Sequence, residues 1–158
     1  SDIVALSKKH NIPTCVDPKK DNFNFYGGVT LFKPNFKEFN DGLKEDFEKS
    51  DFEGISARAI KFSKENNIKN VLLTLSEHGM MLAGDKNTIK VPAVLRNISD
   101  VSGAGDTVIS TAALCVAAGF NSSIVLELAN LAGGIVCEDV GVVPITLSKL
   151  KQEYLKND

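Results

Sequence analysis

The segment DVSGAGDTVIS, residues 100–110, combines residue types that can hold an anion and move a proton. Gly103 and Gly105 let the backbone approach a ligand closely, and the first amides of a helix point at whatever lies before it. Asp106 adds a carboxylate, which repels phosphate. It is therefore either a first-turn residue that complements the helix dipole or a proton acceptor. The segment predicts activation of a hydroxyl group beside a phosphate.

Polar residues elsewhere have two interpretations each. Asn35 and Glu38 have the spacing of a helix capping box, which by itself is the simpler reading. Lys33 and Lys19 could reach a phosphate as point charges, although surface lysines are common. Asp17 could orient one of these lysines or cap a turn.

Composition restricts the partners of this chain. The 158 residues are 43% hydrophobic and 24% charged, as in ordinary soluble domains, and the net charge of -2 gives no field that would attract nucleic acid or an anionic membrane. The sequence shows no export signal and no long apolar run, so we expect a cytoplasmic location. Cys15, Cys115 and Cys137 lack a paired spacing and are expected to be buried, reduced thiols. His10 and His78 are assigned no catalytic role.

Hydrophobic periodicity predicts an α/β domain with a parallel sheet that carries ligands at the carboxyl ends of its strands. We expect strands that end at turn residues, with the last two strands forming a hairpin. Helices and strands are predicted as follows: helix 1–12, strand 13–16, loop 19–28, strand 29–33, a helix that begins at residue 35, helix 51–67, strands 71–75, 79–83 and 88–92, and helices 104–118 and 122–136.

Three segments in the same order resemble the ribokinase-like (PfkB) carbohydrate kinases. DVSGAGD, with the small-residue helix after it and ANLAGGIV at residues 129–136, resembles the C-terminal signature of that family. KPNFKEF, residues 33–39, is similar to its Asn-x-x-Glu element, and TLSEHG, residues 74–79, to its strand and turn near the nucleotide. The resemblance implies a three-layer, Rossmann-like sheet with helices on both faces, of which this chain is the C-terminal part.

A longer segment narrows the resemblance within the family. Residues 16–39 are similar to the heptose 7-phosphate kinases, which transfer phosphate from ATP to the anomeric hydroxyl of the sugar. Kinases of ribose, fructose phosphate or a nucleoside remain alternatives, as does a module that binds nucleotide without turnover. The family's sugar-binding glycines and β lid precede the region matched here. We therefore expect residues 1–158 to be the ATP-binding, catalytic portion, and homodimer formation by the full-length enzyme stays open.

The resemblance also implies roles for single residues. Asp106 would be the general base, beside backbone amides that stabilise the phosphoryl group, contributed by Gly103, Ala104 and Gly105. ATP would be bound by Lys33, Asn35, Glu38, Thr74, Ser76, Gly79 and Asn130. For Asn130, a structural hydrogen bond is the alternative to a contact with ATP, because a side-chain amide in an apolar helix needs a partner.

Metal binding is implied at two places. Glu38 would hold Mg²⁺ through water, which fits the preference of this ion for few carboxylates. Asp100 and Ser102 match positions that hold a monovalent cation in many relatives, together with backbone oxygens of residues 136–141. Asp139 departs from the basic residue that is common there, so this cation stays an open question.

Overall fold

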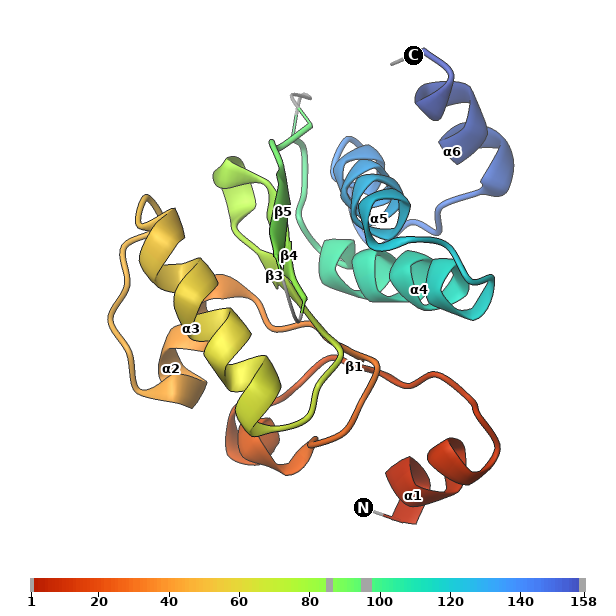
Figure 1. The fold of residues 1–158 in the computed structure, drawn as a ribbon. Helices are drawn as coiled ribbons and strands as arrows, with labels where there is room; N and C mark the ends of the chain where they lie inside the picture. The colour runs from red at the N-terminus through yellow and green to blue at the C-terminus, as the bar shows by residue number, and fades with distance from the viewer. Residues whose placement is uncertain (1, 85–86, 95–97, 157–158) are drawn as a thin grey trace. The chain divides into compact units, whose positions relative to one another are not determined.

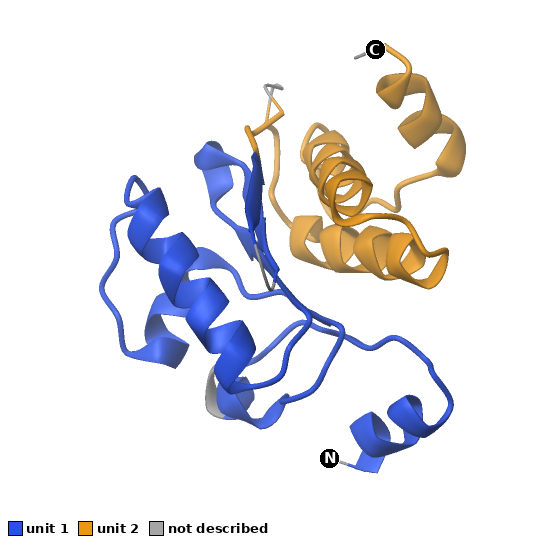
Figure 2. Ribbon diagram, in the orientation of Figure 1, with its two compact units in different colours: residues 1–90 blue, residues 91–158 orange. Residues whose placement is uncertain are grey.

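The computed structural model describes residues 2–84, 87–94 and 98–156, with the backbone alone at residues 20 and 21. Two compact units make up the chain, residues 1–90 and residues 91–158 (Figure 2). Each unit contains some of the predicted site residues, and each is described by itself.

The first unit is built on a mixed sheet with strand order β1-β2-β3-β4-β5 (Figure 1). The strands are β1 Cys15–Val16, β2 Leu31–Phe32, β3 Asn70–Thr74, β4 Met80–Ala83 and β5 Thr88–Val91. β1, β2 and β3 are parallel, with Cys15 opposite Leu31 and Leu31 opposite Asn70. β4 is antiparallel to β3, so the expectation of a parallel sheet holds for three strands only.

The antiparallel strand follows from a tight reversal after β3. The 3-10 turn η2, Ser76–His78, ends at Gly79, which has a φ of 83° that L side chains rarely adopt. The chain therefore returns beside the strand it has just left, and Thr74 lies opposite Met80.

The first two strands are shorter than the sequence predicts. Thr14 and Thr30 exchange hydrogen bonds in which each backbone amide donates to the hydroxyl of the other residue, at 3.1 and 3.2 Å. The amides of Thr30 and Leu31 both donate to the carbonyl oxygen of Thr14, at 3.0 and 2.9 Å, so the ladder is irregular before the strands. The prolines at positions 18 and 34 follow soon after the strands.

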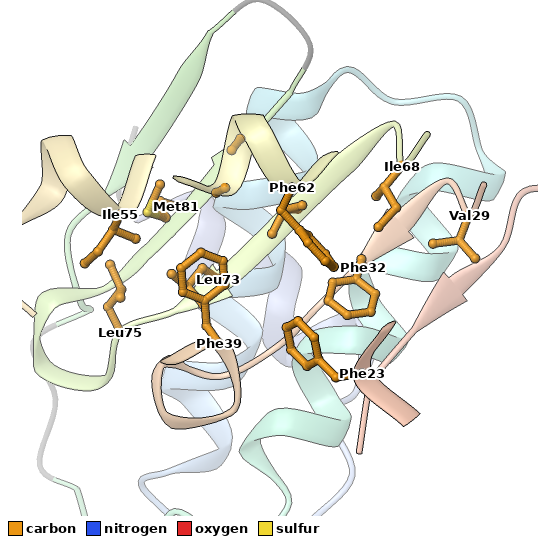
Figure 3. Close-up of a cluster of buried hydrophobic side chains, with 13 residues drawn as sticks. Phe23, Val29, Phe32, Phe39, Ile55, Phe62, Ile68, Leu73, Leu75 and Met81 are labelled. Atoms are coloured by element: carbon orange, nitrogen blue, oxygen red, sulfur yellow. The ribbon is translucent and has the colours of Figure 1, made fainter. Parts of the chain in front are cut away.

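Helices of the first unit are α1 Asp2–Lys9, α2 Phe36–Leu43 and α3 Phe52–Glu65, together with the 3-10 helix η1 Lys20–Phe25. The prediction of a loop over residues 19–28 was wrong at η1. Phe23 in this segment is buried and its ring lies 5.0 Å from that of Phe32 and 5.4 Å from that of Phe62 (Figure 3). Burial of such a side chain stabilises the fold by about 1.5–3 kcal/mol. This gain orders a segment whose polar residues by themselves indicate a loop.

The second unit holds the two long apolar helices, α4 Ala104–Ala117 and α5 Ser122–Val136, as predicted, and a short helix α6 Leu147–Tyr154 that was not predicted. α4 and α5 pack closely because Gly133 has no side chain: a Cβ there would lie 2.7 Å from Cγ2 of Val108. Among the described residues, every helix is too short or too polar to span a lipid bilayer.

Candidate active site

The first turn of α4 presents unpaired backbone donors beside a carboxylate. Gly103 precedes the helix with a φ of 77°, a conformation that favours glycine. The amide of Ala104 donates to the carbonyl oxygen of Val101 at 3.2 Å, whereas within the described residues no acceptor lies on the amides of Gly105 and Asp106. Ala104 is therefore less available to an anion than the sequence suggested. The amides of Gly103, Gly105 and Asp106, none of which has an acceptor among the described residues, are the donors that remain.

The carboxylate of Asp106 lies in this first turn and is exposed to solvent. The hydroxyl of Ser110 donates to the backbone oxygen of Asp106, not to its carboxylate, at 2.7 Å. The side chain is thus left accessible to a ligand at the start of the helix. This arrangement is compatible with both a dipole-complementing residue and a proton acceptor.

The loop before α4 is held by Asp100. Its Oδ1 accepts hydrogen bonds from the amide and the hydroxyl of Ser102 at 2.9 and 2.8 Å, and its Oδ2 accepts from the amide of Gly141 at 3.0 Å. Hydrogen bonds from the Ser102 backbone, the Ser102 hydroxyl and the Gly141 backbone hold the pKa of Asp100 below its usual range.

Some of the predicted ligands of a monovalent cation also take part in hydrogen bonds within the protein. Both carboxylate oxygens of Asp100 are engaged, and the carbonyl oxygen of Cys137 accepts the amides of Ser99 and Asp100 at 2.8 and 3.3 Å. These bonds join the loop before α4 to the segment after α5. Gly141 lies in the segment that was expected to contribute backbone oxygens, but in the structure its amide donates to Asp100, which was not predicted.

In the first unit, the carboxyl ends of the parallel strands gather a second group of predicted residues. Lys33 directly follows β2, is 3% exposed and pairs with Asp17 after β1, with 3.2 Å between Nζ and Oδ1. Asn35 and Thr74 form a parallel bridge at the next position along these strands. Lys33 is therefore a buried, paired lysine and not an ordinary surface lysine, and Asp17 is its partner.

The capping box that the sequence predicted is present at α2. Oδ1 of Asn35 accepts from the amide of Glu38, and Oε2 of Glu38 accepts from the amide of Asn35, both at 2.8 Å. The box leaves Oε1 of Glu38 for another partner. Among the described residues no cluster of three or more histidine, cysteine or carboxylate side chains could hold a metal by itself. A magnesium ion would depend on water and phosphate oxygens here.

The predicted nucleotide turn after β3 is closed by backbone bonds. The amide of Leu75 donates to the oxygen of Gly79 at 2.8 Å, and that of Gly79 donates to Ser76 at 3.0 Å. Ser76 is exposed, whereas Gly79 is buried. His78 is the last residue of η2, and its ring lies 6.2 Å from that of Phe52.

Asn130 on α5 makes the structural hydrogen bond that was one of its two readings. Its Nδ2 donates to the carbonyl oxygen of Pro92 at 2.9 Å. Because that carbonyl can only accept, the amide nitrogen must face it, and Oδ1 points elsewhere. Asn130 keeps one acceptor for a second partner.

A pocket of about 460 Å³ lies between α3 and strands β4 and β5. It contains no predicted site residue, and its lining is largely apolar: Phe52, Glu53, Ser56, Ala57, Ile60, Met81, Thr88 and Lys90. The candidate chemistry is at the strand ends and the helix start, not in this pocket.

Comparison with known proteins identifies the family of these elements. The pattern of the pfkB family of carbohydrate kinases matches residues 3–149. The chain belongs to this family. As a pfkB member it is similar to an uncharacterized sugar kinase of Buchnera aphidicola, with 37% identity over 94% of this chain and 46% of that protein. It is also similar to the bifunctional protein HldE of Pseudomonas savastanoi, with 35% identity over 99% of this chain and 32% of that protein.

Solved structures show the same fold. The pfkB chain superimposes on phosphofructokinase-2 of Escherichia coli with a TM-score of 0.84 and 20% identity, over 98% of this chain and 50% of the enzyme. Ribokinase of Thermotoga maritima gives a TM-score of 0.76 and 22% identity, over 98% and 52%. The fold is ribokinase-like, and the chain spans about half the length or less of the relatives that it matches.

Proposed function

We propose that this chain is the ATP-binding, catalytic C-terminal portion of a sugar kinase that converts D-glycero-β-D-manno-heptose 7-phosphate to the 1,7-bisphosphate. The observation that carries the proposal is the first turn of α4, where the amides of Gly105 and Asp106, which have no acceptor in the described part of the chain, lie beside the exposed carboxylate of Asp106. Donors for a phosphoryl group and a proton acceptor are the parts that transfer to a hydroxyl requires.

In the proposed reaction, the carboxylate of Asp106 takes the proton of the anomeric hydroxyl as that oxygen attacks the γ-phosphorus of ATP. The bond from the γ-phosphorus to the bridging oxygen breaks, and ADP leaves with the electron pair. Backbone amides at the start of α4 stabilise the charge on the transferring group. A positioned base contributes about 10²–10⁴-fold in rate.

Residues at the strand ends of the first unit serve the nucleotide in this proposal. Lys33, held in place by Asp17, supplies a positive charge for phosphate oxygens, and Thr74, Ser76 and Gly79 border the nucleoside. Asn130, which belongs to the second unit, is also assigned to the nucleoside. Glu38 would hold Mg²⁺ through water with the oxygen that the capping box leaves free. When bound, Mg²⁺ neutralises charge on the β- and γ-phosphates.

The heptose assignment rests on residues 16–39 and on the relatives named HldE. A kinase with another sugar or nucleoside substrate is the second candidate, which the fold shared with phosphofructokinase-2 and ribokinase favours. ATP-dependent chemistry together with free cysteines at positions 15, 115 and 137 is typical of a cytoplasmic protein.

The substrate is tested with the full-length kinase and a panel of heptose 7-phosphate, fructose 6-phosphate, ribose and adenosine, with ADP release as the readout. We expect kcat/KM for heptose 7-phosphate to exceed that for each other acceptor by about 100-fold or more. A preference for ribose, fructose 6-phosphate or adenosine would contradict the heptose assignment but leave the kinase assignment intact.

A further inference from the structure

Two segments far apart in sequence are tied together at the start of α4. The amides of Ser99 and Asp100 donate to the carbonyl of Cys137, and the amide of Gly141 donates back to Oδ2 of Asp100 at 3.0 Å. We call residues 99–103 and 137–142, joined by these bonds, the clasp.

Packing reinforces the clasp at the residue that begins the helix. A Cβ on Gly103 would lie 3.0 Å from Cγ1 of Val142, so the side chain of Val142 already rests against the Gly103 backbone. Gly103 and Gly141 both have a positive φ, of 77° and 83°. The backbone on each side of the contact is thus held in a conformation that favours glycine.

Asp100 connects the two segments through its two oxygens. Oδ1 accepts both hydrogen bonds from Ser102, the residue before Gly103, and Oδ2 accepts from Gly141. The loop that leads into α4 is therefore held twice: the Ser102 bonds close its own turn, and the Gly141 bond ties it to the segment after α5.

We propose that Asp100 is a positioning residue that holds the first-turn amides of α4 and the carboxylate of Asp106 in place for phosphoryl transfer. This inference rests on the proposed kinase function. Asp100 acts without contact to the reacting atoms, because its oxygens are engaged by Ser102 and Gly141. A displacement of about 1 Å at a reacting group can lower a rate 100-fold, so the effect of losing the clasp falls on kcat.

The substitution Asp100→Asn separates the effect of the Gly141 bond from that of the Ser102 bonds. The single amide oxygen of asparagine can still accept from the two donors of Ser102, which places its NH₂ group against the amide of Gly141. Two donors then face each other, and the bond to Gly141 is lost. Ser102→Ala removes only the hydroxyl donor and keeps the backbone donor, so it is the milder variant.

A matched control lies outside the clasp. Asp41 is an exposed residue of α2, in the first unit. Asp41→Asn makes the same chemical change as Asp100→Asn. We expect its kinetics to match those of the wild type.

The test is steady-state kinetics of the full-length kinase and these variants, with thermal unfolding measured on the same samples. Asp100→Asn is expected to lower kcat by about 10- to 100-fold while KM for ATP changes less than about twofold. Ser102→Ala should lie between Asp100→Asn and the wild type. An unchanged kcat, a raised KM with kcat intact, or restoration of the Asp100→Asn rate by added potassium would each overturn the proposal.

Hydrogen exchange gives a readout that does not depend on turnover. In Asp100→Asn, the amides of Gly141, Ser102 and Ala104, which are hydrogen-bonded in the wild type, should exchange at least about tenfold faster, with distant amides of α5 unchanged. Unchanged exchange at these amides would refute the clasp. If the wild-type kinase phosphorylates no acceptor while the exchange result holds, the proposed function fails and the clasp stands as a structural device.

Discussion

Glu38 shows how one residue can have a structural and a catalytic assignment at once. Its Oε2 completes the capping box of α2, and Oε1 remains for a magnesium-bound water. The box was predicted from spacing alone, because it depends on residues three apart in sequence. The proposed metal role depends on partners that spacing does not reveal.

The substitution Glu38→Gln distinguishes the two roles. Glutamine can complete a capping box, so the free energy of unfolding should change by less than about 0.5 kcal/mol. Loss of the charge should weaken magnesium-dependent turnover by about 10- to 100-fold, as for other residues that act on a metal through water. Magnesium titrations of the activity measure this effect.

Glu38→Ala is the matched control, because it removes the capping bond as well and should destabilise the fold by about 0.5–2 kcal/mol. If Glu38→Gln keeps the magnesium dependence of the wild type, Glu38 is only a cap.

The cysteines are expected to react slowly. Burial raises the pKa of the Cys15, Cys115 and Cys137 thiols, and for Cys137 the negative charge of Asp100 adds to the effect of burial. A raised pKa lowers the fraction of thiolate, the reactive form, at any pH below it.

Alkylation by iodoacetamide should therefore be slower at neutral pH in the folded protein than in urea, and should keep accelerating above about pH 9. Mass spectrometry of the modified peptides measures each site. A cysteine that reacts equally fast in folded and unfolded protein at neutral pH would contradict this prediction.

At the scale of elements, helices α4 and α5 were predicted closely because their apolar residues continue without interruption and local signals mark their ends. Gly119 follows α4, and Asn121 caps α5 through a hydrogen bond from the amide of Ile124 to its Oδ1. These signals are local, so sequence reasoning can detect them.

Elements and contacts that depend on distant residues escaped prediction. η1 forms because Phe23 packs against Phe32 and Phe62. The sequence left open which role Asp17 has, and its pairing with Lys33 joins residues that follow two neighbouring strands. α6 was missed because its eight residues have few apolar positions. The bond between Asp100 and Gly141 spans 41 residues and has no local signature.

Close packing of α4 against α5 gives a prediction at this scale. Gly133→Ala would place its Cβ 2.7 Å from Cγ2 of Val108, which forces one helix or the valine to shift. We expect a loss of about 1–3 kcal/mol in the free energy of unfolding. Denaturant titration measures the loss.

A double-mutant cycle tests the cause. Val108→Ala removes the opposing methyl groups, so Gly133→Ala should cost less in that background. Equal costs in both backgrounds would show that the clash is not with Val108.

At the scale of the whole molecule, the chain spans 46% of the Buchnera sugar kinase and 32% of HldE. We expect the chain by itself to give no sugar phosphorylation, because the proposed function assigns the sugar to parts of the kinase outside residues 1–158, and transfer needs the acceptor oriented beside the phosphorus.

Assays of this chain and of the full-length kinase with ATP, magnesium and heptose 7-phosphate compare the two directly. Turnover by the chain alone at the rate of the full-length kinase would contradict this expectation, whereas nucleotide binding without turnover would agree with it.

The most direct test of the central claim is the turnover of Asp106→Asn in the full-length kinase. Removal of the carboxylate should lower kcat by about 10²–10⁴-fold, while folding and ATP affinity stay close to those of the wild type. Asp41→Asn, the same change at another exposed helical residue, should have wild-type kinetics. Retention of the wild-type rate in Asp106→Asn would contradict the assignment of Asp106 as the base.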